Sequence, residues 1–492
     1  LLEYNPDTYE AAIELGTLGR VDPWNIGVSW GGPALNFTIS WLRGNQVGLR
    51  FKSSLNTKNV PRKKRGKSFL SSIDARAVAK SSERSEMRSV YDKLLYDMER
   101  SGLMMHSASL SPRTSSAHIS LENVSYGLYV DAIEKALTLA ELHLPRNIRE
   151  IQLHSVDHGY LGPTFKYSRL SSPQDPSNGD RGMSSKSEHL TAIDRINLRE
   201  PERISNPTNQ TDYLLPHTTV GADLSIRAQL MDPDSPLRKQ LYFKLSARTQ
   251  ITRNLDLWIL FGQDVFNDFN NDRKSNSTIR RVRSEINEYL THGESGLDQF
   301  FLEYRNSLGA NLHLRAYAGI LEMMYGGIGG EILFDPYFSR FAFALTVNAL
   351  RQREFEKMLG FKEYETVTGY LSSYYAAPFY DLDFALHLGR YLARDKGGTL
   401  EIRRTFANGF SVGGFFSKTE ISDEDFGEGS FDKGLYFRIP FNGIFPGNTR
   451  NSYSTIIRPL DRDGGRRLED FSGSLWFSRR AYRHDAISNH LL

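Results

Sequence analysis

The chain has 492 residues, enough for roughly two to four domains, and its 61 basic and 58 acidic residues leave a net charge of +3. A charge this close to zero gives no electrostatic argument for binding nucleic acid. The sequence has no cysteine, which excludes disulfides, thiolate metal ligands and cysteine nucleophiles. It also has no run of about 18 apolar residues, so it predicts no transmembrane helix.

Residues 1–53 predict β-strands, because apolar and polar side chains alternate along them and successive strand side chains point to opposite faces. The alternating apolar positions are Tyr9, Ala11, Ile13 and Leu15, then Leu35, Phe37, Ile39 and Trp41, then Val47, Leu49 and Phe51. So few strands cannot close a barrel. We therefore expect residues 1–53 to be the remnant of a first β-barrel whose other strands lie in an N-terminal part that this chain lacks. Residues 54–83 are polar and basic around Pro61 and predict a solvated linker, which we favour over a nucleic-acid patch.

Residues 84–160 change character. Val90, Leu94, Leu95 and Met98 recur at helical spacing, and a second helical stripe begins at Ala132. Strand-like runs at 104–110, 117–122 and 148–155 complete an α-β-β-α-β order, which predicts a small α/β domain with a scaffold or protein-contact role. Residues 161–216 are rich in Ser, Pro, Asn and Asp and predict a polar connector.

From residue 217 to about 480 the alternation is sustained. It is clearest in the runs 220–230, 241–247, 255–261, 312–320, 341–347, 382–388 and 435–441. A transmembrane β-strand needs about 9–11 residues with apolar side chains toward lipid and polar ones toward a lumen. The fold class is therefore mainly β, with an antiparallel transmembrane β-barrel of about 12 strands at 217–480 and a tail at 481–492. A soluble β-sandwich is the alternative, but charged side chains recur on the same face of strand after strand, which favours the barrel.

The sequence shows no motif that demands catalysis, a cofactor or a metal. His154 and His158 would lie roughly 13 Å apart on a strand, too far to share one ion. Asp461, Asp463 and Gly464 resemble the opening of a calcium loop, but the Glu expected at its twelfth position is Ser472. The glycine-rich run 326–330 lacks the lysine of a phosphate loop, and no serine lies in a Gly-x-Ser-x-Gly elbow. We therefore predict that the protein is not an enzyme.

The polar face of the predicted barrel offers candidate polymer-contact positions. Charged and aromatic side chains there would line a lumen and could contact a passing acidic sugar chain, or they could merely fill and solvate the lumen. The candidates are Arg227, Arg315, Tyr317, Asp383, His387 and Tyr391.

Several strings resemble the YjbH-type family of bacterial exopolysaccharide-associated outer-membrane proteins. They are Val-Arg-Ser at 282–284, Gly-Ile-Leu-Glu-Met-Met-Tyr-Gly-Gly-Ile-Gly-Gly-Glu at 319–331, Gly-Arg-Tyr-Leu-Ala-Arg-Asp-Lys-Gly-Gly at 389–398, Phe-Gly-Glu-Gly-Ser-Phe-Asp-Lys-Gly at 426–434, Arg-Pro-Leu-Asp-Arg-Asp-Gly-Gly-Arg-Arg-Leu at 458–468 and, more weakly, Arg-Gly-Asn at 43–45. The resemblance implies two β-barrels with periplasmic material between them, a lipoprotein start that this chain lacks, and no known catalytic residues. The chain would correspond to the C-terminal two-thirds of a family member.

Together these observations predict an outer-membrane protein with a periplasmic domain that supports production, secretion or assembly of an exopolysaccharide. Its expected partners are outer-membrane lipid, the extracellular polysaccharide and other exopolysaccharide-operon proteins on the periplasmic side, with no nucleic acid. Two alternatives stay open: an outer-membrane barrel enzyme acting on lipid or polysaccharide, and a soluble sugar-binding β-sandwich.

Overall fold

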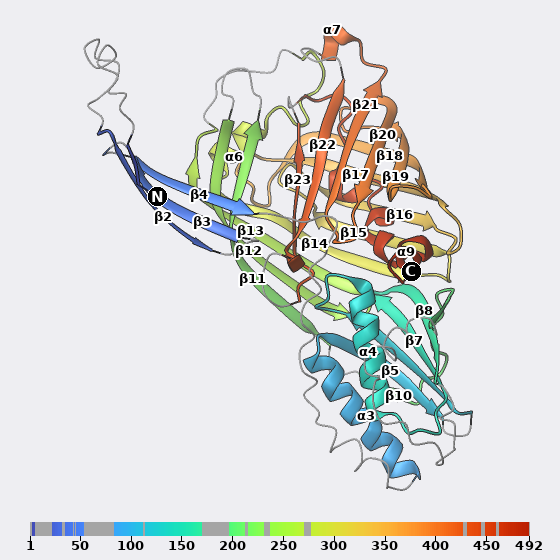
Figure 1. The fold of residues 1–492 in the computed structure, drawn as a ribbon. Coiled ribbons are helices and arrows are strands. Elements are labelled where there is room, and N and C mark those ends of the chain that lie inside the picture. Colours follow the sequence, from blue (N-terminus) through green and yellow to red (C-terminus); the bar gives the residue numbers. More distant parts are fainter. Residues whose placement is uncertain are drawn as a thin grey trace, which may run out of the picture.

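The described residues form three sheets, antiparallel or mixed, with four, six and thirteen strands (Figure 1). The computed structural model describes residues 2–4, 22–31, 35–42, 44, 46–53, 83–111, 114–169, 196–211, 215–230, 237–269, 277–426, 431–443, 448–458 and 462–491. The basic linker predicted at 54–83 and the strand predicted around 9–15 therefore lie outside the described residues, apart from Glu83. No helix in the described part of the chain is long and apolar enough to cross a membrane.

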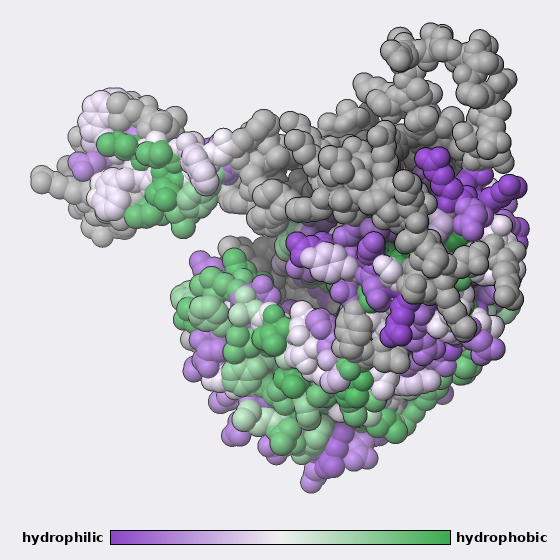
Figure 2. Space-filling model, turned by 90° about the horizontal axis from the view of Figure 1, so that it is seen from below, coloured by the Kyte–Doolittle hydropathy of each residue, from purple (hydrophilic) through white to green (hydrophobic). Residues whose placement is uncertain are grey.

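The N-terminal sheet has one apolar face that is open to the surroundings. Its strands pair in chain order and are β1 (Leu2–Tyr4), β2 (Trp24–Gly31), β3 (Leu35–Leu42) and β4 (Gln46–Ser53). Val28 and Trp30 on β2 are 72% and 81% exposed, whereas Asn25 and Thr38 on the other face are buried. Strands β3 and β4 are those predicted from the alternation, and β2 is an additional one. In the view from below, apolar side chains gather on this small sheet, at the left of Figure 2.

The predicted α-β-β-α-β order is found in the six-stranded sheet and its two helices. The elements are α3 (Glu83–Arg100), β5 (Leu103–Ser111), β6 (Ser116–Asn123), α4 (Tyr129–His143) and β7 (Glu150–Asp157). Strands β6 and β7 are parallel, as expected when a helix makes the crossover between them. The apolar stripes of both helices pack against the sheet, with Leu94, Met98, Ile133 and Ala136 fully or almost fully buried in one core.

The range predicted as a polar connector, 161–216, instead contributes strands to this sheet. They are β8 (Tyr160–Ser168), β9 (Ile196–Arg199) and β10 (Asn209–Gln210), in the sheet order β10-β5-β6-β7-β8-β9. Gly162 and Pro163 make β8 look like a loop, but Leu161 and Phe165 on it are buried. The serine-rich run at 171–178 lies outside the described residues.

The thirteen-stranded sheet begins at residue 217, as predicted, and each strand pairs antiparallel with the next. The strands are β11 (His217–Leu230), β12 (Leu237–Thr252), β13 (Leu255–Asn267), β14 (Ser295–Ser307), β15 (Leu312–Ile320), β16 (Tyr325–Phe334), β17 (Phe341–Arg353), β18 (Phe361–Ala376), β19 (Leu382–Arg390), β20 (Lys396–Thr405), β21 (Ser411–Thr419), β22 (Asp432–Pro440) and β23 (Ser452–Ile457). In the hydrogen-bonded order of the described residues β11 and β23 are the two edges. The structure thus has a thirteen-stranded antiparallel sheet where the sequence predicts a closed barrel of about twelve strands.

This sheet buries its polar face and exposes its apolar one. Along β17, Phe343, Leu345 and Val347 are 50%, 52% and 49% exposed, whereas Thr346 and Asn348 between them are fully buried. The register extends the pattern sideways, because Leu345 lies beside Ile332 on β16 and Leu371 on β18, and Leu371 lies beside Leu388 on β19. All four of these side chains in the row are exposed. A water-soluble sheet has the opposite arrangement.

The strands end at Ile457, about twenty residues earlier than predicted. Residues 462–491, named here the C-terminal segment, form η3 (Glu469–Phe471), α8 (Leu475–Arg479), η4 (Arg480–Tyr482) and α9 (His484–Leu491). The range predicted as the end of the barrel and a tail is therefore short helices. The segment runs from the thirteen-stranded sheet, where α8 contacts β16, to the α/β domain, where α9 contacts α4 (Figure 1). The remaining helices are α6 (Ile286–His292), α7 (Asp423–Phe426) and η2 (Phe441–Gly443).

Candidate functional site

The C-terminal segment covers the buried polar face of the thirteen-stranded sheet. Trp476 is fully buried and stacks on Tyr374 of β18, with ring centroids 4.9 Å apart and an interplanar angle of 14°. The Tyr374 hydroxyl donates a hydrogen bond to the carbonyl of Gly473 at 2.9 Å. The polar face and this segment together form the candidate site, because the polymer-contact residues predicted from sequence lie there.

Arg315 and Tyr317 on β15 bind the segment directly. The Arg315 guanidinium pairs with Glu303 at 2.5 Å and donates to the carbonyl of Asp470 at 2.6 Å and to the Ser474 hydroxyl at 3.0 Å. The Tyr317 hydroxyl donates to the carbonyl of Phe471 at 2.7 Å. These side chains thus hold main-chain atoms of the segment.

Asp383 and His387 on β19 also face the segment. Asp383 accepts from Arg480 at 2.8 Å, and His387 lies 2.7 Å from the Ser372 hydroxyl. Gly473 of the segment has φ +72°, and a Cβ there would lie 2.5 Å from the His387 ring. Only glycine permits both this backbone conformation and this close approach.

Arg227 and Tyr391 lie on the same polar face but contact neighbouring strands. Arg227 donates to Gln240 at 2.5 Å and lies over the Tyr242 ring at 4.9 Å. Tyr391 is fully buried, with its hydroxyl 2.7 Å from that of Thr399. The structure therefore brings four of the six predicted residues to the C-terminal segment, whose position on this face could not be inferred from the sequence pattern.

One buried carboxylate binds the start of the segment to the connection between β13 and α6. Asp463 is fully buried, and one of its oxygens accepts the backbone N–H groups of Val282, Arg283 and Ser284 at 2.8 to 2.9 Å. Its other oxygen accepts the Ser284 hydroxyl at 2.7 Å. The carboxylate considered as part of a calcium loop is thus occupied by backbone donors.

The strings that carry the family resemblance meet around this carboxylate. Asp463 belongs to 458–468 and its partners to 282–284. Arg283 forms an ion pair with Glu322 of the 319–331 string. Asp395 of 389–398 accepts the Gly465 N–H at 2.7 Å, and Asp432 of 426–434 lies 3.4 Å from Arg458. Five of the strings, which span nearly 190 residues of sequence, are therefore connected by hydrogen bonds and ion pairs in the fold.

Comparison with known proteins identifies the family of the chain. The family described as "Exopolysaccharide biosynthesis protein YbjH" matches residues 1–476. The chain belongs to this family. It is also similar to "Uncharacterized lipoprotein YjbH" of Escherichia coli (strain K12), with 37% identity over 209 residues, which are 42% of this chain and 30% of the relative. The match thus spans about a third of the length of that lipoprotein. Membership of the YjbH family confirms the resemblance stated from the strings.

A second polar cluster lies between the α/β domain and strands β12 and β13. Glu122, Asp157 and His158 have ligand atoms within 4.8 Å of one another, so these groups could hold a metal ion. However, the Arg248 guanidinium lies 2.7 Å from His158 and Arg450 lies 3.0 Å from Asp157, so cations of the protein already occupy this cluster. Burial alone would raise the pKa of Glu122, but the nearby His158 and His106 rings outweigh it and hold this pKa well below its usual range. The cluster is best explained as a set of ion pairs and hydrogen bonds that connects the six-stranded sheet to the thirteen-stranded sheet.

His154, the other histidine considered for a metal pair, belongs to a different group. It lies 3.1 Å from His118 and 3.2 Å from the carbonyl of Glu202. Burial, with a smaller effect from His118, lowers the pKa of His154 from 6.5 to about 4.

This pKa predicts a loss of stability in mild acid. The unfolded chain takes up a proton at His154 as the pH falls through about 6.5, whereas the folded domain resists it until about pH 4. The free energy of unfolding should therefore fall by about 3 kcal/mol between these values and no further below them on account of this residue. Denaturant titrations at several pH values should show a smaller decrease for His154→Gln. The exposed His292→Gln is the control, and equal pH dependence in all three proteins would contradict the prediction.

Proposed function

We propose that the thirteen-stranded sheet lies in the bacterial outer membrane as the wall of a barrel, with its apolar face toward lipid and the C-terminal segment inside. The α/β domain lies on the periplasmic side. The protein supports production, secretion or assembly of an exopolysaccharide, and does so without making or breaking bonds.

The observation that carries this proposal is the inverted burial of the sheet. Leu345, Leu371 and Leu388 form part of an exposed apolar row, while Thr346 and Asn348 are fully buried. In water such a row is unfavourable by roughly 1.5–3 kcal/mol for each large side chain left exposed rather than buried. In a bilayer the same row faces hydrocarbon and stabilises the protein.

The comparisons support the polysaccharide and envelope parts of the proposal. The family is described by exopolysaccharide biosynthesis, and the E. coli relative is described as a lipoprotein. A relative described as a lipoprotein and an apolar outer face both suit a protein that works at a membrane.

The contacts of the polar face support the proposal that its charged side chains bind the C-terminal segment. Glu303 is engaged by Arg305 and Arg315, and Asp383 by Arg480. We propose that these pairs hold the C-terminal segment, and that polymer reaches Arg315, Tyr317, Asp383 or His387 only where the segment moves aside.

The test is the amount and the chain length of secreted polymer in cells that lack this protein. We expect the amount of secreted polysaccharide to fall while its chain length and linkages stay the same, and the wild-type gene to restore the amount. Unchanged output would contradict the proposal. Unchanged amount with altered chain length or linkage would favour an enzyme that acts on the polymer.

A further inference from the structure

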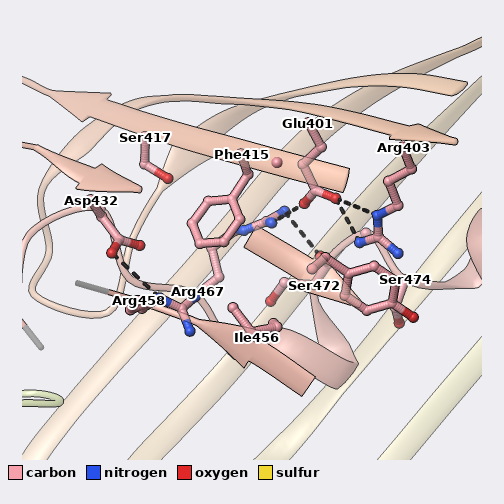
Figure 3. Close-up of a pocket in the computed structure, with 14 residues that line it drawn as sticks. Glu401, Arg403, Phe415, Ser417, Asp432, Ile456, Arg458, Arg467, Ser472 and Ser474 are labelled. Atoms are coloured by element: carbon pink, nitrogen blue, oxygen red, sulfur yellow. Dashed lines mark hydrogen bonds and ion pairs between the residues drawn. The ribbon is translucent and has the colours of Figure 1, made fainter. Parts of the chain in front are cut away.

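A small pocket of about 50 Å³ lies between the last strands of the thirteen-stranded sheet and the C-terminal segment (Figure 3). Its walls come from β20, β21, β22 and β23 on one side and from residues 465–474 on the other. Since roughly 10–15 Å³ of such space holds one water, the pocket accepts about four heavy atoms. A carboxylate group and the carbon that bears it have this size.

The pocket carries an excess of positive charge on one wall. Arg403 and Arg467 share a single carboxylate, that of Glu401: Arg403 donates to it at 2.6 Å and Arg467 forms an ion pair with it. In Figure 3 both guanidinium groups converge on Glu401. Two cations with one anion leave one positive charge, which a monoanion would neutralise.

Aromatic rings hold one of these guanidinium groups and line the pocket beside it. The Arg403 guanidinium lies 4.3 Å from the centroid of Tyr436 and 3.6 Å from that of Phe477. Phe415 projects into the same space between the Glu401 side and Asp432 (Figure 3). Fixed guanidinium planes beside aromatic faces suit a ligand that has both a carboxylate and C–H surface.

One buried hydroxyl in the pocket has no hydrogen-bond partner in the part of the chain that the structure describes. Ser472 is 3% exposed, and its side-chain oxygen has no hydrogen-bond partner among the described residues. Buried polar atoms are nearly always hydrogen-bonded, because leaving one unpaired costs free energy. Ser472 lines the pocket, so a ligand that enters it can supply the missing bond.

We propose that this pocket binds the carboxylate of an acidic sugar, the uronic acid class. Arg403 and Arg467 bind the carboxylate, the Ser472 hydroxyl bonds to the carboxylate or a ring hydroxyl, and Phe415 packs against the C–H edge of the sugar. The rest of the sugar lies outside the pocket. This proposal rests on the proposed function and names the chemical class of the polysaccharide.

The test is titration of the purified full chain in detergent micelles with D-glucuronate, D-glucose and acetate. Glucuronate should bind, glucose should not, and acetate should bind more weakly than glucuronate. Arg403→Gln should weaken glucuronate binding by about tenfold, the usual effect of losing one charge-assisted hydrogen bond. Arg438→Gln is the control, because Arg438 lies on β22 but does not line the pocket. Equal binding of glucose and glucuronate, or of acetate and glucuronate, would overturn the proposal.

The Ser472→Ala variant distinguishes an effect on glucuronate binding from an effect on folding. Because the Ser472 hydroxyl has no partner in the described part of the chain, its removal should leave the thermal stability of the empty protein unchanged or slightly higher, and should weaken glucuronate binding several-fold. A stable Ser472→Ala variant that binds glucuronate as tightly as wild type would overturn the assignment of this residue. If glucuronate fails to bind while secreted polymer still depends on the protein, the pocket proposal fails and the proposed function stands.

Discussion

Replacing Leu345 with arginine is expected to prevent stable insertion of the protein into a membrane. Leu345 lies at the middle of β17, on the exposed apolar face, with Ile332 and Leu371 beside it. An arginine at the bilayer midplane of a β-barrel costs about 2–4 kcal/mol, and less near the interfaces. Urea titration of the protein folded into lipid vesicles measures this difference, and Leu224→Arg on the exposed face of β11 should behave in the same way.

Leu359→Arg is the matched control for this prediction. Leu359 is 69% exposed, more than Leu345, but it lies in the turn between β17 and β18. The same chemical change there should alter the free energy of unfolding by less than about 1 kcal/mol. If Leu345→Arg and Leu359→Arg prove equally mild, the apolar face does not face lipid.

Replacing Asp463 with alanine is expected to release the C-terminal segment from the sheet. The change removes four hydrogen bonds to a buried carboxylate and leaves the backbone N–H groups of residues 282–284 without their acceptor. We expect a loss of about 3–5 kcal/mol in the free energy of unfolding, and a smaller loss for Asp463→Asn, which keeps one acceptor.

Trypsin provides a direct measurement of this release. Arg466 and Arg479 in the segment are buried, so the segment of the wild-type protein should resist cleavage, whereas in Asp463→Ala a C-terminal epitope should be lost rapidly. Asp423→Asn is the control, because Asp423 forms an exposed pair with Lys418 of the kind that contributes little to stability. A segment that remains protected in Asp463→Ala would show that this carboxylate does not hold it.

The strand positions could be predicted because alternation is a local property of the sequence. The runs containing Leu224, Leu345 and Leu386 each read correctly as strands with one apolar face, and the start at residue 217 followed from the first of them. Helices α3 and α4 could be predicted in the same way, because apolar residues recur in them with the period of a helix.

The C-terminal segment and the strands β8 to β10 could not be predicted in this way. Trp476 and Leu475 are buried by the polar face of a sheet that is distant in sequence, so no periodicity of their own marks them. Strand β9 is four residues long and half-exposed, and it forms because β8 offers it an edge. Such contacts depend on tertiary structure, which a local pattern does not contain.

The sequence pattern predicted on which face of each strand the candidate site residues lie. It did not predict which residues they contact. Alternation placed Arg315, Asp383 and His387 on the polar side of their strands, and they lie there. Their contacts with the C-terminal segment required a knowledge of where residues 470–480 fold. Two residues in the sequence could have indicated that the C-terminal segment packs closely against other parts of the chain. Gly473 permits a close approach of the backbone, and Asp463 accepts backbone hydrogen bonds.

Spin labels along β17 can show whether the exposed apolar face of the sheet lies against lipid. The chain has no cysteine, so single cysteines placed at residues 343 to 348 can each carry a spin label without interference. In lipid vesicles, electron paramagnetic resonance should show high accessibility to oxygen and low accessibility to a water-soluble nickel complex at 343, 345 and 347. It should show low accessibility to both reagents at 344, 346 and 348. High accessibility to the nickel complex at 343, 345 and 347 would place this face in water and contradict the account.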